Sequence, residues 1–418
     1  IYLDVPLLVD LEGSEPARAL LALPDIRQSI ERLRSEEHVN YEEITELKLR
    51  VLRAVFATFM EKHGKTGHST ERGKDFYAYC EAEGVYLERY ASFCALQEHF
   101  KSVLPEAVTW REWPEAFRNA NSPEVQQFRR EHEQDLLFWM YLQWQLDQQL
   151  GEAQEYALKR YMRVGLYHDE ALAVDRNGAD CWAWPAFFHD GFTVGAPPDS
   201  FAPDGQDWGF PPPDRDRHRS SGYELFLKQL QASCKHGGAL RIDHVMQIHH
   251  LFWIPPGGKA AEGVYVKDYE QDLLNLLALA SNQNQTIIVG EDLGTLPPNF
   301  RETLMSRGVF SYRLFYFERD QAGNLLNHWE YPRSALVSVS THDLPTLAGF
   351  WLGKDIDTRR DIGLLKPDEE EDARKDRTSH KAKIIEKLVQ TEFLPAPVAH
   401  AAWIEPFPTD ELHAAVLK

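Results

Sequence analysis

The chain has 418 residues, of which 65 are acidic and 45 are Lys or Arg, giving a formal net charge of −20. This length exceeds that of an average domain but is common among barrel enzymes. Nucleic acid is not an expected partner, because phosphate groups are recognised by clustered Lys and Arg. No apolar run approaches the length of a membrane span and no signal-peptide pattern is present, so we expect no membrane partner either.

Cysteine and aromatic contents lead to two further expectations. The cysteines are few and lack metal-type spacing, which predicts a reducing, cytoplasmic location: Cys80, Cys94, Cys181 and Cys234. Aromatic residues make up 12% of the chain, and many stand beside polar residues. Rings with a polar edge suit the amphipathic faces of sugars, although packing in a large core explains most of them.

The first part of the chain reads as a strand followed by helices. The apolar residues 1–9 predict a short strand, within an early barrel segment over residues 1–23. Residues 24–160 are expected to form a mainly helical insertion, because runs such as 41–62 and 125–150 repeat apolar residues at three- and four-residue spacing. Ser122 followed by Pro123 predicts a helix start. The remainder, 161–418, is expected to form the catalytic part of a barrel.

Two segments after the helical part carry candidate binding residues. Residues 164–167 predict a strand with Asp169 just beyond it, and this carboxylate would either bond a substrate hydroxyl or cap the next segment. Residues 194–214 form a long, irregular stretch rich in Pro and Gly. Loops of this length tend to be lids or linkers. Phe201, Gln206 and Trp208 favour a lid over a polar ligand, because a linker would be poorer in aromatic residues.

Three predicted strands end in carboxylates. The strand at 239–242 is followed by Asp243, the strand within 286–294 contains Glu291, and the strand within 335–346 leads to Asp343. The strand predicted at 311–317 has no acid at its end. All strands of a parallel barrel present their carboxyl ends at one face, so the three acids are expected to converge there. Beyond residue 354 the chain is charged and expected to be helical.

Arg241 lies two residues before Asp243, so both side chains leave the same face of the strand. An adjacent Arg favours the ionised carboxylate, as a nucleophile requires. The alternative is an ion pair that only stabilises the end of the strand.

Converging carboxylates suggest either a divalent-metal site or glycosyl transfer through a nucleophile and an acid/base. Arg241 argues against the metal, because a fixed cation would repel it. His244 and His342 suit hydrogen bonds to sugar hydroxyls. The pair at 249–250 points to opposite faces of a strand, which favours packing over metal binding.

Five segments together resemble the 4-alpha-glucanotransferases, the amylomaltase or disproportionating-enzyme family of the alpha-amylase clan. They are GLYHD, VGAPPDSFAPDGQDWGFP, ALRIDHV with LFWIP, IVGEDLGTLP and STHDLPT, and they follow the family's order from residue 165 to 346. The resemblance implies an α/β fold, a (β/α)8 TIM barrel with helical insertions. The family's first strands would precede residue 1 and its last strand would follow residue 418.

The resemblance also implies a retaining double displacement without a cofactor or metal. Asp243 matches the nucleophile, Glu291 the acid/base and Asp343 the acid that stabilises the transition state. Two acids beside Glu291 would raise its pKa, so that it stays protonated near neutral pH.

Binding roles and substrates follow from the same resemblance. Arg241, His342 and Asp169 match residues that bind and orient the substrate, and Phe201, Gln206 and Trp208 match the loop that curls over the glucan. The implied substrates are maltooligosaccharides and starch- or glycogen-derived glucans. Two alternatives are a retaining alpha-glucan hydrolase and a non-catalytic or truncated glucan-binding protein.

Overall fold

The computed structural model of the chain describes residues 2–64, 70–199, 202–404 and 409–418. The chain forms two compact units. Unit 1 consists of Ile1–Ala239 and Ile248–Glu270, and unit 2 of Leu240–Gln247 and Gln271–Lys418.

Unit 1 begins with short helices. The strand predicted for residues 1–9 is wrong over the described residues: η1 (Val5–Leu7) is a 3-10 helix and α1 (Val9–Glu12) follows it. Pro6 lies in the first turn of η1 and could not donate a hydrogen bond to a sheet. The apolar residues Leu3, Val5 and Leu8 are buried against the helices that follow.

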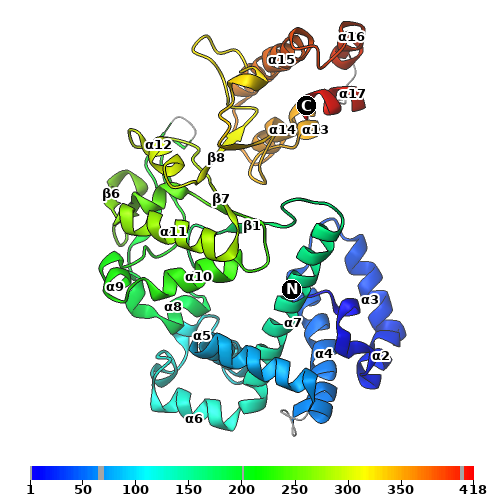
Figure 1. Cartoon of the computed structure of the whole chain (residues 1–418), viewed down its shortest axis with the longest axis vertical. Helices are drawn as coiled ribbons and strands as arrows, with labels where there is room; N and C mark the ends of the chain where they lie inside the picture. The colour runs from blue at the N-terminus through cyan, green and yellow to red at the C-terminus, as the bar shows by residue number, and fades with distance from the viewer. Residues whose placement is uncertain (1, 65–69, 200–201, 405–408) are drawn as a thin grey trace. The chain divides into compact units, whose positions relative to one another are not determined.

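The predicted helical part of unit 1 is confirmed. Figure 1 shows α4, α5 and α7 in blue to cyan-green, and these three helices contact one another around an aromatic core that includes Phe59, Phe76 and Trp144. The helices are α2 (Glu15–Ala22), α3 (Pro24–Ser35), α4 (Tyr41–Phe59), α5 (Glu71–Val103), α6 (Pro123–Glu131), α7 (Glu133–Lys159), α8 (Ala179–Ala183), α9 (Arg215–Ser220) and α10 (Glu224–Cys234).

The cap predicted at Ser122 is confirmed, because its hydroxyl accepts a hydrogen bond from the Val125 amide at 3.1 Å and Pro123 occupies the first turn of α6. The run predicted over 125–150 is divided between two helices that meet at His132.

The stretch 194–214 is less irregular than its composition predicts. It contributes to an antiparallel sheet of β2 (Thr193–Ala196), β3 (Gln206–Asp207), β5 (His250–Ile254) and β6 (Val264–Lys267), in the order β3-β2-β5-β6. Gly195 pairs with Asp207. A Cβ atom at Gly195 would lie 1.9 Å from the Gln206 carbonyl oxygen, so only glycine permits this close strand pairing.

Unit 2 is built on a parallel sheet. The strands β4 (Ala239–Ile242), β7 (Ile287–Gly290), β8 (Phe310–Leu314) and β9 (Ala335–Ser338) lie in that order, and β7, β8 and β9 pair in parallel. The four strands predicted in this part of the chain are confirmed: β4 has the predicted bounds, and the other three end earlier than predicted. The described strands form an open sheet, and closure into an eight-stranded barrel is not seen among them.

The strand predicted at 164–167 begins later, as β1 (Tyr167–Glu170). The carbonyl of Leu166, just before it, accepts hydrogen bonds from the amides of Gly238 and Ala239 at 3.0 and 3.3 Å. The start of β4 is thereby held beside the start of β1.

Helices complete unit 2, as predicted for the region beyond residue 354. They are α11 (Glu270–Asn284), α12 (Phe300–Met305), α13 (Leu347–Leu352), α14 (Lys354–Asp361), α15 (Pro367–Gln390), α16 (Ala396–Ile404) and α17 (Asp410–Val416). The helices α13 to α17, orange to red in Figure 1, enclose a core that includes Trp351, Ile384 and Leu412.

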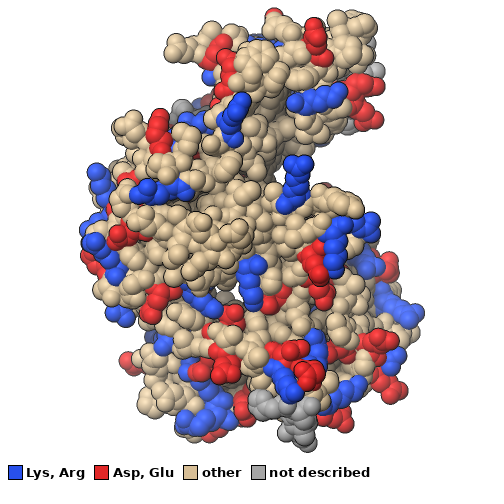
Figure 2. Space-filling model, in the orientation of Figure 1, with Lys and Arg blue, Asp and Glu red and all other residues tan. Residues whose placement is uncertain are grey.

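The surface carries charges of both signs. Figure 2 shows Lys and Arg interspersed with Asp and Glu over the face in view. Among the described residues, no helix combines the length and the apolar character that crossing a membrane requires.

Candidate active site

The ion pair predicted at the end of β4 is present. A guanidinium nitrogen of Arg241 lies 2.8 Å from a carboxylate oxygen of Asp243. Arg241 is buried, with 8% of its side chain exposed, whereas Asp243 is 37% exposed. The buried cation therefore fixes the orientation of a carboxylate that solvent and a ligand can reach.

Glu291 directly follows β7 and lies beside this pair. The Glu291 amide donates to the Ile242 carbonyl at 2.9 Å, and the Glu291 carbonyl accepts from the Val245 amide at 2.9 Å. The carboxyl ends of β4 and β7 are thus joined by backbone hydrogen bonds. The structure therefore brings Arg241, Asp243 and Glu291 together, as the strand pattern predicts.

The Glu291 carboxyl group is buried and held by two backbone amides. One oxygen accepts from the Leu293 amide at 2.7 Å and the other from the His244 amide at 2.9 Å. The pKa of Glu291 is raised, and burial of the carboxyl group is the largest cause. The two amides lower this pKa; among the nearby charges, Asp243 raises it and Arg241 lowers it. The upward direction agrees with the sequence-based prediction, but its main cause is burial rather than neighbouring acids.

A tight turn brings His244 to Glu291. His244 adopts the left-handed conformation with φ of 45°, which aims its amide at the Glu291 carboxyl group. Gly290 is required opposite this turn, because a Cβ atom there would lie 2.8 Å from a methyl carbon of Val245. His244 therefore contributes its backbone to the site.

A second buried acid, Asp292, was not assigned a role from the sequence. Its carboxylate is fully buried and accepts from Arg301 at 2.7 Å and from the Tyr312 amide at 3.0 Å, as well as from the Ser311 hydroxyl. These bonds tie the segment after β7 to β8. The acidic pair at 291–292 and the later Arg301 are the only sequence signals we identify for this role.

His342 and Asp343 follow β9, two strands from β7 in the sheet. Their side chains are 3.3 Å apart and strongly exposed, at 67% and 72%. The Asp343 amide donates to the Thr341 hydroxyl at 3.1 Å. The acid thus lies after a parallel strand, as predicted, and it is far more open to solvent than Glu291.

The remaining predicted binding residues belong to unit 1. Asp169 is an exposed residue of β1. Gln206 is an exposed residue of β3, and its side-chain oxygen accepts a hydrogen bond from the Trp208 indole at 3.0 Å. Phe201 lies outside the described residues.

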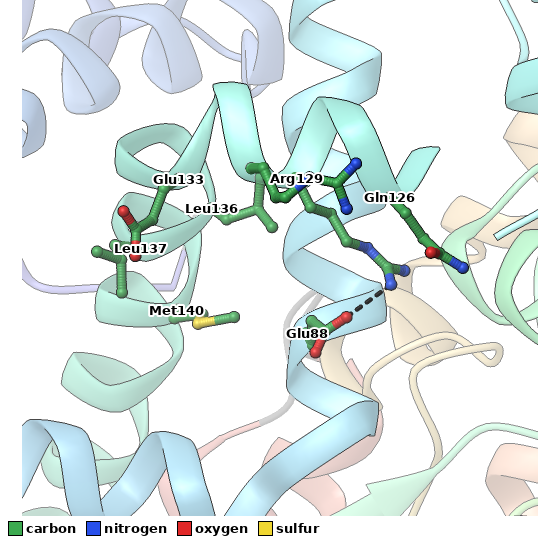
Figure 3. Close-up of a pocket in the computed structure, with 8 residues that line it drawn as sticks. Glu88, Gln126, Arg129, Glu133, Leu136, Leu137 and Met140 are labelled. Carbon is green, nitrogen blue, oxygen red and sulfur yellow. Dashed lines mark ion pairs between the residues drawn. The ribbon is translucent and has the colours of Figure 1, made fainter. Parts of the chain in front are cut away.

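Unit 1 also contains a cavity of about 650 Å³ among α5, α6 and α7. Figure 3 shows Arg129 reaching towards Glu88 across one side of it, and the two form an ion pair at 2.6 Å. Leu136, Leu137 and Met140 form an apolar part of the lining. None of the residues predicted to bind or transform a substrate lines this cavity, so it is separate from the candidate site.

These observations define the class: an α/β protein with a buried carboxyl group and an arginine-held carboxylate at the carboxyl ends of adjacent strands in a parallel sheet. The sequence places it in a family. Residues 2–405 match glycoside hydrolase family 77, described as 4-alpha-glucanotransferase, and the chain belongs to this family.

Named relatives agree with this assignment. The chain is 31% identical over 398 residues to the 4-alpha-glucanotransferase of Haemophilus influenzae, covering 94% of this chain and 56% of the relative. It is 34% identical over 372 residues to the 4-alpha-glucanotransferase of Mycobacterium tuberculosis, covering 87% and 50%. The chain therefore spans about half the length of these curated relatives.

Solved structures support the fold. The amylomaltase from Corynebacterium glutamicum superimposes with a TM-score of 0.81 at 27% identity, over 97% of this chain and 53% of that one. An amylomaltase from Streptococcus agalactiae in complex with acarbose gives a TM-score of 0.66 at 20% identity, over 83% and 65%, and shows similarity of fold alone. The α/β fold with a parallel sheet and helices is thus that of the amylomaltases.

Proposed function

We propose that the protein is a 4-alpha-glucanotransferase that moves alpha-1,4-glucan segments between maltooligosaccharides, or between glucans derived from starch or glycogen. The observation that carries the proposal is the pair formed by Glu291, with its raised pKa, and Asp243, held by Arg241. A retaining mechanism needs an acid that can be protonated and an oriented nucleophile. The raised pKa of Glu291 suits the first role, and the hold of Arg241 on Asp243 suits the second.

In the proposed reaction, Asp243 attacks the anomeric carbon while Glu291 protonates the leaving glycosidic oxygen. A covalent glycosyl-enzyme forms and the shortened glucan departs with the new hydroxyl. Glu291, now ionised, takes the proton from the 4-hydroxyl of an acceptor glucan as that oxygen attacks the anomeric carbon and displaces Asp243. Arg241 keeps Asp243 correctly oriented before attack.

Asp343 and His342 are proposed to bond the sugar hydroxyls as the transition state develops. Their exposure leaves both side chains open to a glucan. His244, assigned from the sequence to substrate binding, is proposed to do so with its imidazole while its amide holds Glu291. No cofactor is required, because every proton and bond in this scheme is handled by carboxyl groups.

Asp169, Gln206 and Trp208 are proposed to bind the glucan, together with Phe201. The hydrogen bond between Trp208 and Gln206 holds an aromatic and an amide side chain in one arrangement suited to a sugar ring. By excluding water, such a loop would favour a sugar acceptor over hydrolysis.

We also propose a cytoplasmic location. The four cysteines, all within the described residues, form no disulfide bonds with one another. Cysteines left reduced are usual in a reducing compartment.

Incubation of the purified protein with maltotriose tests the function. Transfer yields glucose together with maltopentaose and longer chains, separated by chromatography. Hydrolysis yields glucose and maltose alone, and a protein that only binds glucan leaves maltotriose unchanged. Either of the last two results would contradict the proposal.

A further inference from the structure

Strand β8 carries no acid at its carboxyl end, yet one of its residues contacts Asp292, which follows Glu291, Arg241, which holds Asp243, and Ser338, at the end of the strand that leads to Asp343. This residue is Tyr312, which is 6% exposed and packs with Val289 and Leu314 in the core of the parallel sheet. Its contacts run in three directions, through its backbone, its ring and its hydroxyl.

The backbone and ring of Tyr312 connect to the first two acids. Its amide donates to Asp292, the residue after Glu291, at 3.0 Å. Its ring lies below the guanidinium of Arg241, 5.7 Å from centroid to carbon, and Arg241 in turn holds Asp243. A buried ring at this distance attracts the cation and limits where it can lie.

The hydroxyl of Tyr312 connects to the segment of the third acid. It lies 2.8 Å from the Ser338 hydroxyl oxygen, and the Ser338 hydroxyl donates to the Ser340 carbonyl at 3.0 Å. Since Ser338 has a single hydroxyl proton, Tyr312 must be the donor in their shared bond. In a separate contact, the Ser340 hydroxyl lies 2.9 Å from the Pro345 carbonyl oxygen and 3.2 Å from the Thr341 carbonyl oxygen, and it has one proton to donate to either.

The hydrogen bonds from Tyr312 to Ser338 and from Ser338 to the Ser340 carbonyl tie β8 to the start of the loop that contains His342 and Asp343. The contact between Ser340 and Pro345 spans both residues, whose side chains are strongly exposed. Together with the bond from the Asp343 amide to the Thr341 hydroxyl, these hydrogen bonds restrain the loop that carries the exposed acid.

We propose that Tyr312 is a positioning residue that sets the three acids relative to one another, fixing Arg241 with its ring and the 339–345 loop with its hydroxyl. This inference rests on the proposed transferase function only for its effect on activity. Its structural content, restraint of the loop by the hydroxyl, holds independently of the reaction catalysed.

Tyr312→Phe tests the proposal, because it removes the hydroxyl and keeps the ring. We expect kcat for maltotriose transfer to fall about fivefold to tenfold, the equivalent of one hydrogen bond, with KM changed less than about twofold. Ser338→Ala removes the acceptor of the same bond, so the double variant should lose little more activity than either single variant.

Tyr316→Phe is the matched control. Tyr316 lies just beyond β8, is also buried, and its hydroxyl has no hydrogen-bond partner among the described residues. This variant should leave kcat unchanged.

Amide hydrogen exchange provides a readout independent of activity. Deuterium uptake over residues 339–346 should rise in Tyr312→Phe and in Ser338→Ala, but not in Tyr316→Phe. Unchanged deuterium uptake in Tyr312→Phe overturns the inference. An unchanged kcat of this variant, with an active wild-type protein, also overturns it. So does a double variant whose loss of kcat equals the combined losses of the two single variants. An inactive wild-type protein would refute the proposed function, and the uptake measurement would still decide the role of Tyr312.

Discussion

Replacing Glu291 by Gln is the most direct test of the proposed chemistry. The change keeps the size of the side chain but removes the proton that the acid/base must give and take. Removal of a general acid/base typically lowers the rate by about 10²–10⁴-fold, so we expect transfer to fall into this range. Glucan binding should remain, because Asp343, His342 and Trp208 are untouched.

The same variant has a predictable effect on stability. The carboxyl group accepts from the amides of His244 and Leu293 with different oxygens, whereas the Gln amide has one oxygen and presents an NH2 to the other donor. One buried amide loses its acceptor, which lowers the free energy of unfolding by about 1–3 kcal/mol. The difference in stability between the variant and the wild type is expected to depend on pH.

Burial raises the pKa of Glu291 above the ordinary value of 4.5, so the folded protein holds this proton more tightly than the unfolded chain. The stability linked to Glu291 is therefore fully present below pH 4.5 and is lost as the pH rises through the raised pKa. Glu291→Gln cannot titrate, so its deficit in Tm should shrink as the pH rises from about 4.5 to 7.

Initial rates of maltotriose transfer, calorimetric Tm at several pH values and isothermal titration with maltotriose measure these effects. The matched control is Glu318→Gln, which neutralises a carboxylate that is 16% exposed and paired with Arg313 at 3.3 Å. Turnover close to wild type in Glu291→Gln, or a Tm deficit that grows with pH, would refute the assignment.

Three further changes test other parts of the site. Arg241→Lys replaces the planar group that holds Asp243 with a point charge, so kcat should fall by about tenfold or more while Tm changes little; wild-type kcat would show that orientation of the carboxylate is unimportant. Gly290→Ala places a methyl 2.8 Å from a carbon of Val245 and should destabilise the fold by about 1–3 kcal/mol, measured by urea unfolding; an unchanged midpoint would contradict the close packing. Trp208→Ala should raise the ratio of glucose release to transfer by admitting water, and an unchanged ratio would remove Trp208 from the proposed loop.

The elements that the sequence predicts well are those specified by local chemistry. Ser122 and Pro123 specify a helix start through local interactions alone. Strand β4 was predicted from an apolar run that ends in a charged cluster. The strand predicted over residues 1–9 fails for the opposite reason. Leu3, Val5 and Leu8 belong to a buried cluster that includes residues of α4 and α7, more than forty positions away, and no local pattern contains that information.

For the candidate site, residue identity was easier to predict than environment. The strand pattern indicates that Arg241, Asp243 and Glu291 meet, and the structure confirms it. The pattern also suggests that neighbouring acids raise the pKa of Glu291, whereas burial is the larger cause. Burial depends on the packing of strands that are distant in sequence, so it becomes visible only in the folded chain.

Tyr312 shows most clearly what a search for charged groups overlooks. A strand without a terminal acid was given no role, although a phenol combines a ring for Arg241 with a donor for Ser338. The sheet lets this one residue contact Asp292 with its backbone and Arg241 and Ser338 with its side chain. Parallel strands have their carboxyl ends at the same edge of the sheet. A residue on the strand between two acid-bearing strands is therefore well placed to align the two acids. In parallel sheets with acids on several strands, the buried polar residues of the intervening strand are therefore the next candidates for positioning roles.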